Sequence, residues 1–354
     1  MDINSEQLQE IVGPLLSWFV RCQRDLPWRH DPTPYRVWIS EIMLQQTRVE
    51  PVIPYYLRFM ETLPDVETLA AAPQDQLMKL WEGLGYYSRA ANLQKAAQKI
   101  VEQGAFPADH DGWLALPGIG AYTAGAICSI ALGLPTPAVD GNVLRVLSRI
   151  LCSEEDIALP ATKKAFHEAL CKVYPEGRCS DFTQALMELG AIVCLPNGEP
   201  KCDGCPVREL CLARKKDMLD RIPVKTGKKP RKTADKTVLL LRHGNRIALN
   251  RRPAKGLLAN LWEFPNWEQK CAREEVAERL SALKPEAVRP LPDSTHIFTH
   301  IEWHMCGYEV IVGREDEGYT WATIDDVLLE KAIPSAFRCY TNYLRNLRYE
   351  VTEE

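Results

Sequence analysis

The hydrophobic pattern divides the chain into two parts. From the N-terminus to about Lys216, apolar residues recur with a period near 3.6, in segments separated by short Gly/Pro breaks. This pattern predicts a series of helices, and no run in this part alternates well enough to predict a strand. The helical segments are residues 8–20, 37–47, 51–60, 69–81, 88–101, 123–133, 142–151, 161–174 and 183–193.

The pattern changes at Val224. Residues 224–236 are basic and almost without apolar side chains, which is typical of an interdomain linker. Short β-type runs then follow at Thr237–Leu241, Arg246–Leu249 and Trp303–Val312. Helical patterns cover 272–283 and 336–347. The C-terminal part is therefore predicted to be an α+β domain over 237–354, joined by a linker to an all-α domain over 1–223.

Length and composition agree with this division. A chain of 354 residues is longer than one hydrophobic core normally organises, and 46% hydrophobic with 25% charged residues is usual for a globular protein. The formal net charge is −4, so any nucleic-acid surface must be a local basic face. The uncharged stretch 112–139 is interrupted by Gly and Pro, which favours a short buried helix over a membrane span. The polar N-terminus lacks a secretory signal pattern, and we expect a cytoplasmic protein.

Four cysteines form one compact spacing motif. Their spacing is C-x7-C-x2-C-x5-C, formed by Cys194, Cys202, Cys205 and Cys211. In a reducing compartment, thiols this close in sequence predict a metal centre. Structural zinc usually shows two paired C-x2-C units, whereas a single pair with outlying cysteines also suits a [4Fe–4S] cluster. Spacing favours the iron–sulfur cluster and leaves zinc as the alternative.

A glycine-rich turn precedes a carboxylate at a helix start. Residues 116–120 read LPGIG between two helical segments, and the backbone N–H groups near Gly118 and Gly120 can hold a DNA phosphate. A simple helical corner is an equal alternative. Asp140 then precedes Gly141 and another helix. It is interpreted either as an ordinary N-cap or as a catalytic anion held in a fixed place.

Glu41 is the candidate partner for this carboxylate. It stands in an otherwise apolar helical segment, and apolar surroundings raise the pKa of a carboxyl group. Cleaving a base–sugar bond needs an acid at the base and an anion near the cationic sugar. Glu41 and Asp140 fit these two roles, although a solvated helix glutamate is the ordinary interpretation of a lone Glu.

Several motifs in this order resemble the helix–hairpin–helix DNA glycosylases with a Gly/Pro-rich loop and an aspartate, and within them the adenine DNA glycosylase (MutY) family. The matching segments are 26–29, 40–47, 83–87, 116–120, 139–143 and the four cysteines. They cover most of residues 20–215, and the likeness continues more thinly to the end. The resemblance implies two helical lobes: a six-helix lobe over about 30–140, and an iron–sulfur lobe of 1–29 plus 141–223.

The resemblance also implies an activity. The family removes adenine mispaired with 8-oxoguanine or guanine during base excision repair. By resemblance, Glu41 protonates N7 of the adenine, Asp140 stabilises the sugar cation, and Tyr122 and Asn142 complete the catalytic pocket. The cysteines would hold a [4Fe–4S] cluster, and the partner would be double-stranded DNA bound by a monomer. The adenine pocket would be lined by Trp28, Arg29, Leu44 and Gln184. The wedge that enters the base stack would be formed by Gln46 and Tyr86.

Two further features refine this expectation. Endonuclease III-like relatives carry a lysine at the position of Tyr122, so its absence favours a glycosylase that does not cut the strand. The C-terminal part resembles the MutT/Nudix-like recognition domain of the family. There Phe298, Thr299 and His300 would sense 8-oxoguanine. The alternatives are a bifunctional endonuclease III-like lyase and a catalytically silent iron–sulfur DNA-binding protein.

Overall fold

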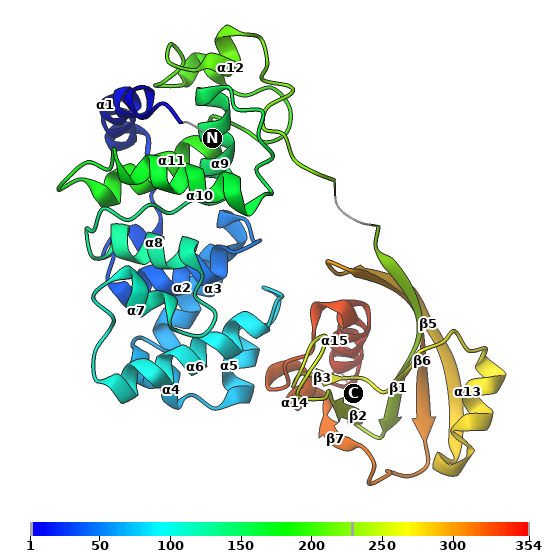
Figure 1. Cartoon of the computed structure of the whole chain (residues 1–354). Coiled ribbons are helices and arrows are strands. Elements are labelled where there is room, and N and C mark those ends of the chain that lie inside the picture. The colour runs from blue at the N-terminus through cyan, green and yellow to red at the C-terminus, as the bar shows by residue number, and fades with distance from the viewer. Residues whose placement is uncertain (1–2, 228–229, 353–354) are drawn as a thin grey trace. The chain divides into compact units, whose positions relative to one another are not determined.

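The computed structural model describes residues 3–227 and 230–352 (Figure 1). The chain forms two compact units. The first contains Met1–Ala70 and Asn92–Gly227, and the second contains Ala71–Ala91 and Lys228–Glu354. Segment 71–91, which sequence analysis assigned to the helical domain, thus groups with the C-terminal residues.

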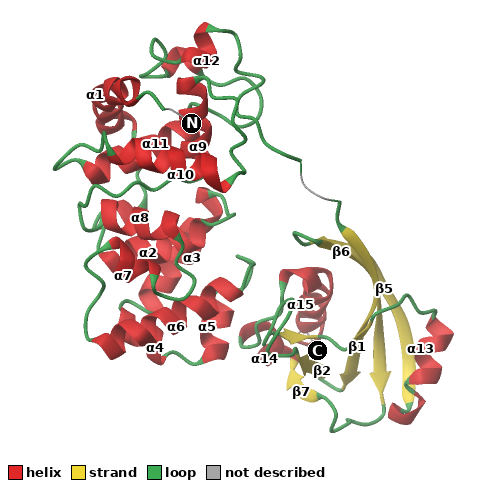
Figure 2. Cartoon of the chain, in the orientation of Figure 1, coloured by secondary structure: helices red, strands yellow, loops and turns green. Residues whose placement is uncertain are grey.

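The described residues up to 227 form helices joined by turns and loops, and the prediction of no strands there is confirmed for these residues (Figure 2). Its helices are α1 (Ser5–Cys22), α2 (Pro34–Leu44), α3 (Val49–Thr62), α4 (Val66–Ala71), α5 (Gln74–Leu80), α6 (Ser88–Gln103), α7 (His110–Leu114), α8 (Ala121–Ile130), α9 (Gly141–Leu151), α10 (Pro160–Cys171), α11 (Cys179–Ile192) and α12 (Leu212–Lys215). Short 3-10 turns lie at Pro27–Arg29 and Cys202–Gly204.

Helix α1 packs against helices from much later in the chain. Asn4 begins it by accepting hydrogen bonds from the backbone N–H groups of the first turn. Its apolar face, which includes Leu8, Ile11 and Leu15, forms one core with buried residues of α9, α10 and α11. The N-terminal helix therefore joins the residues after 140 in one hydrophobic core.

The glycine-rich turn lies between α7 and α8. Gly118 has a φ of 77°, and a Cβ there would stand 2.6 Å from Cβ of Asn92, so both conformation and space require glycine. Helix α8 is buried along most of its length, as expected for a core helix between two turns. Among the described residues, no helix is long and apolar enough to cross a membrane.

Helix α8 also fixes the loop that leads to Asp140. A Cβ on Gly125 would lie 2.3 Å from the carbonyl oxygen of Pro137. The helix and the loop thus approach each other more closely than any side chain would allow. This contact holds the backbone just before Asp140 against a rigid element.

The C-terminal residues form a seven-stranded sheet with helices on both faces (Figure 2). The strand order is β3-β2-β1-β6-β5, with β1 parallel to β6, β4 paired with β1 and β7 paired with β2. The strands are β1 (Lys232–His243), β2 (Arg246–Arg251), β3 (Trp262–Glu263), β4 (Asn266–Trp267), β5 (Pro285–Ile297), β6 (Ile301–Val312) and β7 (Thr320–Thr323). The helices are α13 (Arg273–Arg279), α14 (Ile324–Leu329) and α15 (Arg338–Thr352).

Alternation along β1 explains the two layers. Val238 and Leu240 pack into the core that includes residues of α14 and α15, whereas Leu239 and Leu241 pack into the core that includes residues of α13. The α+β prediction for this domain is confirmed.

The predicted linker is too long at its C-terminal end. Its last five residues, 232–236, belong to β1 and pair with Ile301–Met305 of β6. Lys236 is only 3% exposed, because its ammonium lies over the ring of Trp303 and bonds Asn266. The polar composition of residues 232–236 gave no sign of a strand, although these residues pair with β6 and bury Lys236. Residues 228–229 of the predicted linker lie outside the described part of the chain.

Candidate active site

A pocket of about 590 Å³ lies in the first unit and collects most of the predicted site residues. Those that line it are Trp28, Arg29, Glu41, Leu44, Gln46, Tyr122, Asp140, Asn142 and Gln184. They come from α2, α8, α9, α11 and the turns beside them. Segments far apart in sequence thus meet at one cavity, and the two candidate carboxylates face the same space.

Glu41 is buried in the wall of this pocket. It lies in α2, which begins with Pro34 at its first position after the cap Thr33. The carboxyl is 5% exposed, and the Tyr122 hydroxyl donates a hydrogen bond of 2.5 Å to its Oε2. Burial raises the pKa of Glu41 to about 7, although the hydrogen bond from Tyr122 opposes this rise. Glu41 can therefore remain protonated near neutral pH.

Asp140 is the N-cap of α9 and also faces the pocket. Its Oδ1 accepts the backbone N–H of Val143 at 2.7 Å, and its Oδ2 accepts Nδ2 of Asn142 at 2.8 Å. Burial raises the pKa of Asp140, while these N–H donors and the charge of Arg145 lower it. The two interpretations from sequence are therefore compatible, because capping is what fixes the carboxylate in the pocket.

Glu188 is a site residue that sequence reasoning missed. It is 1% exposed on α11, and its Oε2 accepts a hydrogen bond from Arg29 at 2.8 Å. Arg24 binds the same carboxylate with Nε at 2.8 Å, NH2 at 3.0 Å and its backbone N–H at 3.0 Å. Burial alone would raise the pKa of Glu188, but the bonds from Arg24 and Arg29 lower it to about 2. The carboxylate is thus an anion that fixes Arg29 at the pocket wall.

The signal for Glu188 was present in the sequence. It lies four residues after Gln184 in an otherwise apolar helical segment, which is the same kind of setting that singled out Glu41. A carboxylate on an apolar helix face needs a partner when it is buried.

Arg145 connects the pocket to the cysteine loop. Its guanidinium donates to Oδ1 of Asn142 at 2.9 Å, to the carbonyl of Gly190 at 2.8 Å and to the carbonyl of Cys194 at 2.8 Å. Asn142 in turn donates to Asp140. A continuous series of hydrogen bonds therefore joins the backbone of Cys194 to the carboxylate of Asp140.

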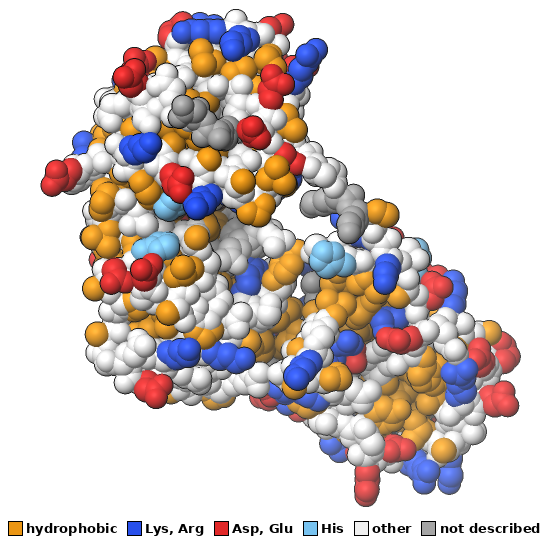
Figure 3. All heavy atoms as spheres, in the orientation of Figure 1, with side chains coloured by type: hydrophobic (Ala, Val, Ile, Leu, Met, Phe, Trp, Pro, Cys, Tyr) orange, Lys and Arg blue, Asp and Glu red, His pale blue; other side chains and the backbone are white. Residues whose placement is uncertain are grey.

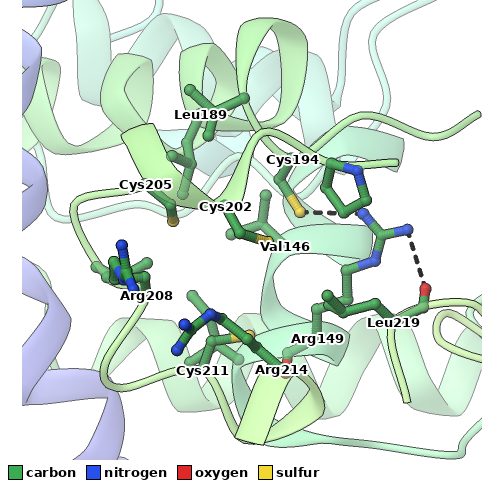
Figure 4. Close-up of a pocket in the computed structure, with 14 residues that line it drawn as sticks. Val146, Arg149, Leu189, Cys194, Cys202, Cys205, Arg208, Cys211, Arg214 and Leu219 are labelled. Carbon is green, nitrogen blue, oxygen red and sulfur yellow. Dashed lines mark hydrogen bonds between the residues drawn. The ribbon is translucent and has the colours of Figure 1, made fainter. Parts of the chain in front are cut away.

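The four predicted cysteines line a second, smaller pocket (Figure 4). Arg149 reaches its edge and donates to Sγ of Cys194 at 3.3 Å, and Arg208 and Arg214 also line the pocket. Among the described residues, no three Cys, His or carboxylate side chains are grouped closely enough to hold a single metal ion. The donor set is therefore four thiols arranged around a shared space, with arginine side chains beside them.

Basic side chains gather near this loop. Lys215 and Lys216 are exposed at the end of α12, and Figure 3 shows Lys and Arg side chains over this end of the first unit. Exposed Asp217 and Asp220 follow these lysines, so the charge at this end is mixed.

The remaining predicted residues lie away from the main pocket. Gly118 and Gly120 form the hairpin before α8. Phe298, Thr299 and His300 form the turn between β5 and β6, where Phe298 packs edge-on to Trp303 at a centroid distance of 4.8 Å. Within the second unit, the hydroxyls of Tyr86 and Thr299 lie 2.8 Å apart.

Comparisons with known proteins agree with this architecture. Residues 39–176 match the HhH-GPD superfamily of base excision DNA repair proteins, and residues 237–342 match the NUDIX domain. A thermostable thymine-DNA glycosylase superposes with a TM-score of 0.54 at 30% identity, covering 60% of this chain and 98% of that chain. Endonuclease III from a non-covalent complex with DNA gives a TM-score of 0.51 at 25% identity, covering 61% and 99%.

Curated relatives match along almost the whole chain. The adenine DNA glycosylase of Homo sapiens is 36% identical, covering 93% of this chain and 73% of that protein. The adenine DNA glycosylase of Mus musculus is 32% identical, covering 94% and 78%. That of Buchnera aphidicola subsp. Schizaphis graminum is 33% identical, covering 82% and 84%.

The helical fold with its hairpin, the two carboxyls that line one pocket and the family match define a helix–hairpin–helix base-excision-repair glycosylase, an enzyme class that hydrolyses N-glycosyl bonds. The second unit adds a Nudix-like domain. The sequence identity to adenine DNA glycosylases over most of this chain shows its family within this enzyme class. The chain belongs to the adenine DNA glycosylase (MutY) family.

Proposed function

We propose that this protein removes adenine paired with 8-oxoguanine or guanine from duplex DNA, without cutting the strand, in base excision repair. The observation that carries the proposal is the pair of carboxyls, buried Glu41 and half-buried Asp140, which line one pocket in different hydrogen-bonding environments. The relatives are adenine DNA glycosylases, which supports adenine as the base that is removed. Glu41 and Asp140 supply the acid and the anion that the cleavage needs.

The reaction balances with these two groups. A flipped adenine enters the pocket, and Glu41 donates its proton to N7. The bond between N9 and the sugar then breaks, and its electron pair leaves with the base. The positive charge that develops on the sugar is stabilised by the carboxylate of Asp140. Water adds to the sugar and loses a proton, which restores the acid.

The environments assign the roles. Asp140 accepts two N–H hydrogen bonds at a helix N-terminus, which favour its ionised form. Glu41 accepts only the Tyr122 hydroxyl among the bonds found for its carboxyl, and its pKa is about 7. Burial raises the pKa of both carboxyls, but at Asp140 the N–H donors and the charge of Arg145 oppose the rise, so we assign Glu41 as the acid and Asp140 as the anion.

The pocket also has a fixed polar wall for the base. Trp28 is 7% exposed and packs edge-on against Tyr56, so its ring is held in place. The guanidinium of Arg29 is fixed by Glu188 and by the carbonyl of Arg24. Leu44 and Gln184 line the same space. These residues form the proposed adenine pocket.

The direct test is single-turnover release of free adenine from a duplex with adenine opposite 8-oxoguanine. Glu41→Gln should slow release by roughly a hundredfold to ten-thousandfold, the usual contribution of a general acid. The wild-type rate should fall as pH rises through about 7, because the acid loses its proton there. Release by Glu41→Gln at the wild-type rate would refute the acid assignment. Tight binding of the wild type without any release would instead favour a silent DNA-binding protein.

The same pocket argues against the lyase alternative. Among the described residues that line it there is no lysine, and Tyr122 occupies the start of α8. A Schiff base with the sugar needs an amine. Borohydride treatment of the wild type with its substrate should therefore trap no covalent adduct, and efficient trapping would contradict the proposal.

The cysteine pocket supports a [4Fe–4S] cluster held by Cys194, Cys202, Cys205 and Cys211. The four thiols line one small pocket, and a single C-x2-C pair with an outlying cysteine on each side suits this cluster, with zinc as the alternative. When bound, the cluster would order the loop from 194 to 211; Arg149 would hydrogen-bond one ligand sulfur. Purified protein should contain iron and sulfide and absorb visible light. Stoichiometric zinc without iron would refute this assignment.

The lesion partner is proposed on the second unit. Phe298, Thr299 and His300 would contact 8-oxoguanine, and the Tyr86 hydroxyl beside Thr299 supports a shared surface for the base pair. Base release from pairs with 8-oxoguanine should exceed release from pairs with guanine, and Thr299→Val should reduce that preference. A monomeric, cytoplasmic enzyme remains our prediction.

A further inference from the structure

Two neighbouring residues of α8 reach the same end of α2. The Tyr122 hydroxyl donates to Glu41, and the next residue, Thr123, accepts Nε2 of Gln45 on its Oγ1 at 3.3 Å. Glu41 and Gln45 are four residues apart and therefore project from one side of the helix end. The first bond belongs to the acid, and the second has no part in the chemistry described above.

The second bond lies beside a strained residue. Gln46 has a φ of 62°, a left-handed conformation that is unfavourable for any residue with a Cβ. Such conformations persist where the surrounding structure holds them. Locally, the N–H of Thr47 bonds the carbonyl of Leu44 at 3.2 Å. The Gln45–Thr123 bond adds a contact from another helix at the residue just before the strained one.

Thr123 is suited to act as an anchor. It is 2% exposed in the buried helix α8, whereas Gln45 is half-buried and Gln46 is exposed at the pocket rim. The anchor is therefore rigid, and the residue that it positions is free to enter a duplex. Helix α8 also begins directly after Gly120 of the hairpin.

We propose that Thr123 is a positioning residue that acts through Gln45: it holds the strained turn at Gln46 so that this side chain can occupy the space of an extruded adenine. The inference rests on the proposed function, in which Gln46 is the wedge. Contact with DNA at the hairpin is then linked through α8 to the wedge as well as to the acid.

The test measures base extrusion separately from cleavage. A duplex with 2-aminopurine in place of adenine, opposite 8-oxoguanine, reports unstacking by its fluorescence. Thr123→Val keeps the branched shape and removes the acceptor, so the extrusion equilibrium should fall by roughly twofold to tenfold, the range for one neutral hydrogen bond. Thr123→Ser keeps the hydroxyl and should restore it. Ser129→Ala, which removes a hydroxyl bonded only within α8, is the matched control and should leave extrusion unchanged.

Gln46→Ala identifies the route of the effect. If Thr123 acts through the wedge, adding Thr123→Val to Gln46→Ala should lower extrusion no further. Gln45→Leu removes the same bond from a half-buried position and provides the test if Thr123→Val fails to fold.

The outcomes separate this inference from the function on which it rests. If Gln46→Ala impairs extrusion while Thr123→Val and Gln45→Leu do not, the positioning role is overturned and the wedge stands. If the effects of Thr123→Val and Gln46→Ala add fully, Thr123 does not act through Gln46, and the inference is also overturned. If Gln46→Ala has no effect, the wedge assignment itself fails, and the inference fails with it.

Discussion

Glu41→Gln is expected to slow adenine release strongly and to make the protein more stable at the same time. Burial raises the pKa of Glu41 from its ordinary 4.5 to about 7. At about 1.4 kcal/mol for each tenfold change in proton affinity, ionising this carboxyl in the folded protein costs about 3 kcal/mol. Because the side chain is 5% exposed, water screens little of this cost.

The sign of the pH dependence follows from the direction of the pKa shift. Between pH 4.5 and about 7 the unfolded chain has released the proton that the folded protein retains, so wild-type stability falls as pH rises through this window. Above about pH 7 both states are ionised and the full cost remains. Glutamine has no proton to lose, so the variant avoids the cost.

Thermal unfolding followed by far-UV circular dichroism at about pH 5 and about pH 8.5 measures the difference. The advantage of Glu41→Gln should be small at the lower pH and reach about 3 kcal/mol at the higher pH, or roughly 5–10 °C in the unfolding midpoint. Glu50→Gln is the matched control, because Glu50 lines the same pocket but is exposed. If the unfolding midpoints of Glu41→Gln and the wild type differ by the same amount at both pH values, burial is refuted as the cause of the raised pKa of Glu41.

Three further variants test the rest of the site. Asp140→Asn keeps an oxygen that can cap Val143 but removes the charge, so adenine release should slow by about a hundredfold to a thousandfold with little change in the unfolding midpoint; a large loss of stability would show that the charge serves folding. Glu188→Gln leaves two arginines without their anion and should destabilise the protein by about 3 kcal/mol at neutral pH, measured by denaturant titration. Gly190→Ala places a Cβ 2.5 Å from Cβ of Asn142, so we expect a loss of roughly 1–3 kcal/mol together with slower adenine release; an unchanged rate would mean that the Asn142 position is not critical.

Sequence periodicity predicted most of the helices, although residues 69–81, predicted as one helix, include the end of α4 and the whole of α5, which are separated at Ala72 and Pro73. Glu41 and Asp140 were also predictable, the first from its apolar neighbours and the second from its place before a helix. Their meeting at one pocket was predicted from the chemistry of base removal and from the family resemblance, and not from the local pattern, because it depends on packing between helices distant in sequence. Glu188 shows the limit: its setting resembled that of Glu41, but only the fold reveals the two arginines that make it an anion instead of an acid.

The C-terminal sheet was harder to predict. Strand β5 carries Pro285, Pro290 and Pro292, which argue against a strand in any local analysis. The three prolines are tolerated because β5 lies at the edge of the sheet and because its pairing with β6 shifts register between Leu291 and Ser294. Edge position is a property of the assembled sheet, so the sequence alone does not contain an obvious sign of it.

The arrangement around Arg145 suggests why a cysteine loop can matter to chemistry that takes place elsewhere. Asp140 is useful only while its carboxylate points into the pocket, and Asn142 holds one of its oxygens. Asn142 is held by Arg145, which also donates to the carbonyls of Gly141, Gly190 and Cys194. Disordering the loop at Cys194 removes one hydrogen-bond acceptor from the buried guanidinium of Arg145. The guanidinium is then expected to move toward water and to lose its bond to Asn142. If the cysteines hold the proposed cluster, its removal should displace the Asp140 carboxylate before the pocket unfolds, so adenine release should decline earlier than the far-UV signal.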